Sequence, residues 1–194
     1  MKEKLTLRNI IIWGAAFLGL LFFFLGFAVK AQVYGQGEGG KWQYVFTNAI
    51  WSDSTLEIYL NGKLMDAGAV TGKPFILPII GVILLLVAVI GAVLVSFLVK
   101  DAKLSKILLI AAGGVAILGG VFVFFVGESA LRSFAYAMGG EEALNDMASI
   151  RAEMKQAGFH DGPRALGVII GIVAILAGAS FGVAPFLPEK KLIK

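Results

Sequence analysis

Four long stretches of this chain contain no Asp, Glu, Lys, Arg or His. They are residues 9–29, 75–99, 107–126 and 165–187. The hydrocarbon core of a bilayer is about 30 Å thick, and a helix that rises 1.5 Å per residue needs about 20 apolar residues to cross it. Every stretch is long enough. We therefore predict an all-α transmembrane fold, an antiparallel four-helix bundle.

The composition agrees with a membrane protein. Of the 194 residues, 58% are hydrophobic, and the mean hydropathy is +0.87. The spans leave no room for a separate soluble domain of typical size, so we expect residues 1–194 to form a single membrane domain. The chain has no cysteine, which excludes disulfides, a thiolate nucleophile and cysteine-based metal sites. It also lacks Asn-x-Ser/Thr, and the two absences together favour a bacterial plasma membrane.

The charges divide into two groups with opposite balance. The N-terminal tail, the connection at 100–106 and the C-terminal tail hold nine Lys or Arg against three Asp or Glu. The two long loops, 30–74 and 127–164, hold eight against ten. Basic residues in short segments mark the cytoplasmic side. Both termini are therefore expected inside and both loops outside, and the basic excess indicates lipid headgroups rather than nucleic acid as its partner.

The first apolar stretch has a second interpretation. A basic start, an apolar segment and small residues around Ala31 are also typical of a secretory signal. A signal core has only about 7–15 apolar residues, however, and this stretch is longer. We expect a retained first helix at about 9–29.

The first outer loop is predicted to contain β structure at 41–66. Residues 41–47 are rich in aromatic and β-branched side chains, and residues 55–60 alternate between apolar and polar. Asn61-Gly62 then favours a tight type I′ hairpin turn, while the glycine-rich segment 35–40 reads as an irregular exit from the membrane. We predict a hairpin or a three-stranded sheet. It is either a lid over the helix ends or a recognition surface with aromatic anchors at Trp42, Tyr44, Trp51 and Tyr59.

The bounds of the remaining helices are predicted from the residues that interrupt the apolar and helical patterns. Helices at about 75–99 and 107–138 should form an antiparallel hairpin, the second projecting beyond the bilayer as far as Gly139-Gly140. A short outer helix is expected at 141–157 and a last membrane helix at 165–187. The outer helix should pack on the hairpin or lie on the headgroups.

Small residues recur at four-residue steps in the last two membrane helices. Such spacing lets helices approach closely in lipid, where packing drives association. The stripe serves either packing between these helices or association of several copies. Its members are Ala112, Ala116, Gly120, Gly167, Gly171, Gly178 and Gly182.

No group of residues predicts catalysis. His160, the single histidine, lies beside Asp161, but no second His or Cys completes a transition-metal site, and we expect an exposed turn. The acidic residues of 141–153 lack the alternation of a calcium loop, and each hydroxyl of Ser96 and Ser180 can bond its own helix. We therefore expect no enzyme activity, cofactor or metal.

The layout resembles the claudin-type tetraspan family. Both have a long first outer loop with β structure, tightly joined second and third helices, and a third helix that extends outside. Trp51, Ser54 and Leu64 follow the spacing of that family's Trp and two cysteines, but both cysteines and the preceding Gly-Leu are absent here. The resemblance covers the whole topology and about fifteen residues of motif. It implies a four-helix fold, and it does not carry over a paracellular-barrier function.

We expect a non-catalytic structural, adhesion or accessory subunit that acts through its extracellular module. This expectation rests on the absence of charges within the spans and of any reactive cluster. Its partners would be the lipid bilayer and another membrane or envelope protein or a second copy of itself. The alternative is a small channel or the membrane subunit of a transporter, which would require oligomerisation because the spans offer little polar path.

Overall fold

The computed structural model describes residues 6–36, 42–49, 54–60, 63–70, 73, 75–163 and 165–187. Its contacts divide the chain into two compact units. The first, here called the helical unit, comprises Met1–Gly26, Ile80–Phe122 and Ile169–Lys194. The second, the sheet unit, comprises Phe27–Ile79 and Val123–Val168. Each unit is described by itself.

Among the described residues, four helical segments are long and apolar enough to cross a membrane, as expected of a multi-pass membrane protein. They are Leu7–Ala28, Ile76–Leu98, Ala102–Asn145 and Ala165–Phe186. The individual helices are α1 (Leu7–Leu25), α2 (Ile76–Leu98), α3 (Ala102–Val123), α4 (Val126–Asn145), α5 (Met147–Gln156) and α6 (Ala165–Val183). Short 3-10 turns, η1 (Gly26–Ala28) and η2 (Ala184–Phe186), follow α1 and α6.

Side-chain caps set the starts of two membrane helices. Thr6 accepts a hydrogen bond from the backbone N–H of Asn9 at 3.2 Å, which satisfies one of the unpaired donors in the first turn of α1. Asp101 Oδ1 accepts from the N–H of Leu104 at 2.7 Å at the start of α3. Only three residues separate α2 from α3, so the two helices form an antiparallel hairpin, as predicted.

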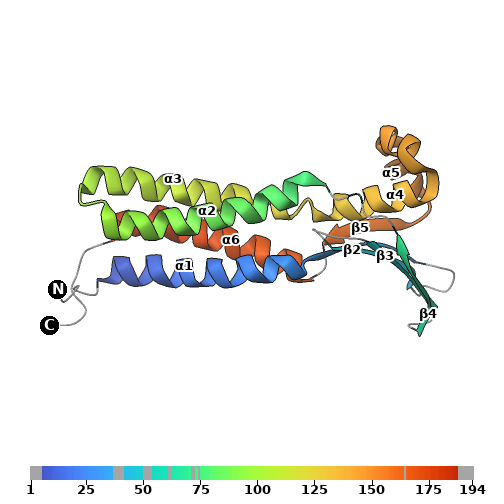
Figure 1. The fold of residues 1–194 in the computed structure, drawn as a ribbon, viewed down its shortest axis with the longest axis horizontal. Helices are drawn as coiled ribbons and strands as arrows, with labels where there is room; N and C mark the ends of the chain where they lie inside the picture. Colours follow the sequence, from blue (N-terminus) through green and yellow to red (C-terminus); the bar gives the residue numbers. More distant parts are fainter. Residues whose placement is uncertain are drawn as a thin grey trace. The chain divides into compact units, whose positions relative to one another are not determined.

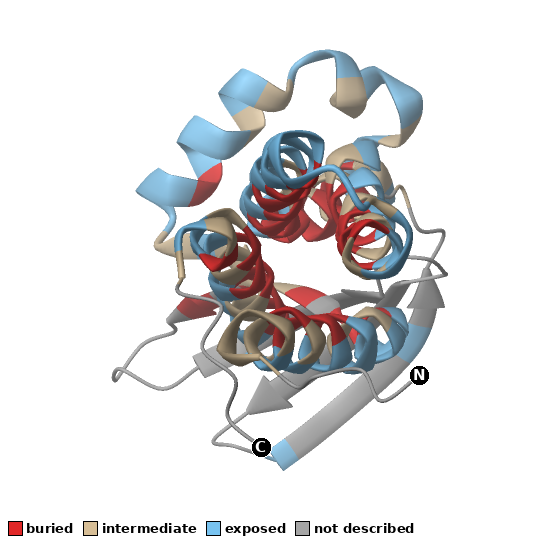
Figure 2. Cartoon of the chain, turned by 90° about the vertical axis from the view of Figure 1, so that its left-hand side faces the viewer, coloured by how far each residue is buried: buried red, intermediate tan, exposed pale blue. Residues whose placement is uncertain are grey.

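The core of the helical unit is almost entirely apolar. Its largest fully buried side chains are Ile12, Leu85, Leu109, Ile170 and Phe181, and alanines fill much of the remaining space. Buried residues lie on the inward sides of the helices (Figure 2). Large apolar side chains cover the outside, among them Phe17 at 68% exposure and Leu98 at 70%. An apolar exterior of this kind suits a lipid environment.

The sheet unit contains a five-stranded antiparallel sheet in the order β4-β3-β2-β1-β5 (Figure 1). The strands are β1 (Lys30–Gln36), β2 (Trp42–Ala49), β3 (Ser54–Leu60), β4 (Lys63–Val70) and β5 (Phe159–Pro163). Leu60 pairs with Lys63, as the predicted hairpin requires, while the turn residues Asn61 and Gly62 lie outside the described residues.

The sheet is larger than the hairpin or three-stranded sheet predicted from the first loop. Gly35 and Gln36, expected in an irregular exit, belong to β1. His160 and Asp161, expected in a turn, belong to β5 and pair with Tyr34 and Val33 of β1. The added strands come from the start of the first loop, directly after the first membrane segment, and from the second loop. Backbone hydrogen bonds between these two segments, which are distant in the sequence, hold both of them as strands, although neither sequence alone predicts a strand.

The outer helices also begin and end differently from the prediction. A break at residues 124–125 separates α3 from α4, so the predicted helix 107–138 is two helices. Gly140, at the predicted break, adopts φ 65° and kinks α4, which continues to Asn145. Asp146 then caps α5 through the N–H of Ser149 at 3.4 Å, dividing the predicted helix 141–157. Helix α4 packs against β1 and β5 of the sheet.

Candidate functional site

The predicted aromatic anchors are spread along the sheet. Trp42 and Tyr44 belong to β2 and Tyr59 to β3, whereas Trp51 lies outside the described residues. The register pairs Trp42 with Gln36, next to an irregularity in the β1–β2 ladder, and it pairs Tyr44 with Ile58. Three of the four candidates are therefore held at defined backbone positions of one sheet.

Strand β4 forms one edge of this sheet. Within the described part of the chain, its backbone pairs with β3 alone. An edge strand presents a row of N–H and C=O groups that can pair with another chain, and natural proteins usually block such edges with charges or bulges. In β4 the charged residues, Lys63 and Asp66, and the irregularity opposite Tyr59 all fall in the first half. Residues 67–70 carry no such feature.

A pair of serines ties the entry of α2 to α4. Ser129 Oγ accepts from the N–H of Phe75 at 2.9 Å, and Ser133 Oγ accepts from the N–H of Lys73 at 2.8 Å. Both serine side chains are completely buried. Four residues along a helix span about 6 Å, and two residues of extended chain span about 6.6 Å. The spacing of the two serine acceptors therefore matches the spacing of the two N–H donors. Pro74, between the donors, has no N–H to satisfy.

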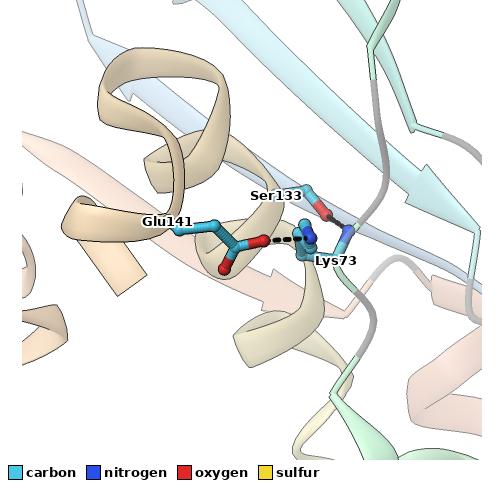
Figure 3. Close-up of polar contacts among 3 residues, drawn as sticks. All are labelled: Lys73, Ser133 and Glu141. Atoms are coloured by element: carbon cyan, nitrogen blue, oxygen red, sulfur yellow. Dashed lines mark hydrogen bonds and ion pairs between the residues drawn. The ribbon is translucent and has the colours of Figure 1, made fainter. Parts of the chain in front are cut away.

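The side chain of Lys73 adds a second connection to α4 (Figure 3). Its Nζ lies 2.6 Å from Oε1 of Glu141 and 4.2 Å from the centroid of the Tyr136 ring. The hydrogen bond to Glu141 raises the pKa of Lys73 above its ordinary value of 10.5. The contribution of the Lys73 ammonium to this pair is therefore complete below pH 10.5 and is lost as the pH rises through the raised pKa. Because both groups are accessible to water, this is a weak surface pair.

Glycines of the predicted stripe bring α3 and α6 together. A Cβ added at Gly120 would lie 2.7 Å from the carbonyl oxygen of Gly171, and one added at Gly178 would lie 2.5 Å from that of Gly113. Ala116 is fully buried, and Ala112 is 9% exposed. A Cβ at Gly182 would meet nothing within 4 Å.

Gly167 belongs to the sheet unit and has different neighbours. A Cβ there would approach the side chains of Pro163, Val29 and Val126. The predicted stripe is therefore not one continuous contact.

The two remaining sequence candidates, His160 and Asp161, line a cavity within the sheet unit. Its volume is about 270 Å³, and Phe159 of β5 with residues of α4 and α5 supplies the rest of its lining. Arg151 of α5 lies at this cavity and forms an ion pair with Glu128 in the first turn of α4. Among the described residues, no cluster of three or more His, Cys, Asp or Glu is arranged to hold a metal ion.

Sequence reasoning did not identify Ser129, Ser133 or Arg151 as functional candidates. Two serines four residues apart on a helix carry a weak signal, since the same spacing occurs on exposed faces. Their role depends on the segment 73–75, which lies more than fifty residues earlier in the chain.

A search with protein-family models and a search of curated proteins found no match to this chain.

Proposed function

We propose that this protein is a non-catalytic integral membrane protein, a structural, adhesion or accessory subunit. In this proposal both termini are cytoplasmic, the sheet unit is extracellular, and the membrane is a bacterial plasma membrane. Its partner is another envelope protein or a second copy of the chain. The proposal is compatible with a distant relationship to claudin-type tetraspan proteins, without their cysteine pair.

The observation that carries the proposal is the unprotected half of β4. Residues 67–70 (Ala-Gly-Ala-Val) stand at the sheet edge without Lys, Pro or bulge. An extended partner strand would pair with this edge and extend the sheet through main-chain hydrogen bonds. Such an interaction requires no catalytic group.

The apolar core of the helical unit supports a structural role over transport. Among the described residues of this unit, Ser105 is the one buried polar side chain, at 4% exposure. It accepts a hydrogen bond from Arg8 at 2.7 Å. A polar path would therefore have to form between several copies of the chain.

The test begins with the full chain, tagged and extracted from its native membrane in mild detergent. Mass spectrometry of the co-purifying proteins and mass on a sizing column identify the assembly. We expect either a stoichiometric partner or a homo-oligomer. A clean monomer under conditions that preserve other membrane complexes would contradict the proposal.

Substitutions then test the role of the edge. Ala69→Lys introduces a charge on the edge strand β4 and should abolish most of the association. Ala152→Lys makes the same change at an exposed position of α5 and should leave the assembly intact. Equal recovery of the partner with both variants would locate the contact elsewhere and remove the edge from the proposal.

A further inference from the structure

The cavity beside His160 has an apolar floor. Leu131 of α4 and Met154 of α5 are 1% and 8% exposed, and both line it. Phe159 of β5 completes this floor, with its ring centroid 6.4 Å from that of Phe134. At about 270 Å³ the cavity lies just below the usual range for drug-sized ligands, about 300–1,000 Å³. It therefore suits a small molecule with a short apolar part.

The charges around the cavity balance. Arg151 and Glu128 form an ion pair in which the Glu128 side chain is only 19% exposed. Lys155 and Asp161 line the same cavity and add one charge of each sign. Arg151, Glu128, Lys155 and Asp161 together carry no net charge. A ligand with only one sign of charge would meet a lining group of the same sign, Asp161 for an anion and Lys155 or Arg151 for a cation.

We propose that this cavity binds a small zwitterion that carries a primary ammonium and a phosphate or carboxylate. The anionic group lies at Lys155 and Arg151. Nη2 of Arg151 donates a hydrogen bond to Glu128, and a guanidinium has five N–H donors. Arg151 can therefore bind the carboxylate of Glu128 and the anionic group of the ligand at the same time. The ammonium lies at Asp161 and against the face of Phe159, which adds a cation–π attraction. The apolar part of the ligand covers Leu131 and Met154.

Two sources offer this chemistry, the headgroup of an ethanolamine phospholipid and a free apolar amino acid. Both combine a primary ammonium with an anion within a few bonds. The cavity involves neither β4 nor its edge, so this inference stands or falls separately from the proposed function.

The test uses the purified full chain in nonionic detergent and isothermal titration with three matched headgroups. Glycerophosphoethanolamine carries both charges, glycerophosphoglycerol lacks the ammonium, and glycerophosphocholine has a methylated ammonium without N–H donors. We expect the first to bind at least about tenfold more tightly than the other two, a difference of about 1.4 kcal/mol. Comparable binding of glycerophosphoglycerol would show an anion site and overturn the proposal.

L-leucine provides the carboxylate form of the zwitterion. Binding of leucine without glycerophosphoethanolamine would support the proposal with a free amino acid as the source. Retention of phosphatidylethanolamine over phosphatidylglycerol in native mass spectrometry from mixed nanodiscs would support it with the lipid as the source. Failure of both zwitterions to saturate the protein would overturn it.

Variants connect the binding to the named groups. Lys155→Gln and Asp161→Asn should each weaken binding of glycerophosphoethanolamine about tenfold or more. Lys103→Gln and Glu142→Gln likewise replace a charged group by an amide, at exposed positions outside the cavity. Both should leave the binding of glycerophosphoethanolamine unchanged. Because Asp161 packs near Gly127 of α4, circular dichroism checks each fold. Lys155 lies exposed near the end of α5, so Lys155→Gln keeps the test informative if Asp161→Asn unfolds. Unchanged binding by Lys155→Gln would contradict the placement of the ligand's anionic group at Lys155.

Discussion

The two buried hydroxyls of α4 each receive a backbone N–H from the segment leading into α2. An unsatisfied buried donor costs more than the net gain of a typical hydrogen bond. We therefore expect Ser129→Ala, which removes the acceptor of the Phe75 N–H, to lower the free energy of unfolding by about 1–3 kcal/mol. The loss should appear as a lower thermal unfolding midpoint of the purified protein in detergent.

Ser180→Ala is the matched control. Ser180 Oγ donates to the carbonyl oxygen of Leu176 in its own helix at 2.8 Å, and removing it leaves no backbone donor unpaired. A change within about 0.5 kcal/mol is expected. Equal losses from the two substitutions would show that the hydroxyl of Ser129 has no special role.

At the scale of elements, adjacent glycines of α3 differ in what they face. A Cβ on Gly113 would lie 2.6 Å from the carbonyl oxygen of Gly178 and 3.0 Å from the nitrogen of Gly182, both backbone atoms of α6. A Cβ on Gly114 would meet nothing within 4 Å. Both changes to alanine improve helix propensity equally, so comparing them isolates the contact between helices.

We expect Gly113→Ala to destabilise the protein by about 1–3 kcal/mol, because the helices must separate to admit the methyl group. Gly114→Ala should be neutral or stabilise the protein by up to about 1 kcal/mol. Unfolding by titration of a denaturing detergent measures both variants against the unchanged chain. Gly113→Ala as stable as Gly114→Ala would mean that α3 and α6 do not approach through these glycines.

The elements differ in how far the sequence predicted them. The four apolar spans and the β2–β4 region follow from local patterns, namely runs without charge, β-branched alternation and Asn-Gly. Strands β1 and β5 could not be predicted from local patterns, because each contains a glycine, Gly35 or Gly162, and glycine is a poor strand residue. Both segments become strands by pairing with each other. Gly35 is tolerated there for a packing reason, since a Cβ would lie 2.6 Å from the ring of Phe159.

The whole molecule carries a charge asymmetry that bears on its orientation. In the helical unit, the contacts of Arg8 with Ser105 and of Lys106 with the Phe186 ring bring the start of α1, the start of α3 and the end of η2 together. Lys100 and Lys103 belong to the same end through the short α2–α3 connection. Trp13 also lies near this end, stacked on Phe97 at 5.4 Å between ring centroids. The partner of Trp13 lies on α2, more than eighty residues later in the chain, so this contact depends on the fold.

The orientation is tested by single cysteines, since the chain contains none of its own. Lys103→Cys lies in the basic connection and Glu142→Cys in the second loop, and both positions are exposed. Because basic residues in short segments are retained in the cytoplasm, a membrane-impermeant maleimide should label Glu142→Cys on intact cells and Lys103→Cys only after permeabilisation. Ala152→Cys, in the same loop as Glu142, should label like it. The reverse pattern would place the sheet unit in the cytoplasm, and labelling of all three on intact cells would mean that the α3–α4 segment does not cross the membrane.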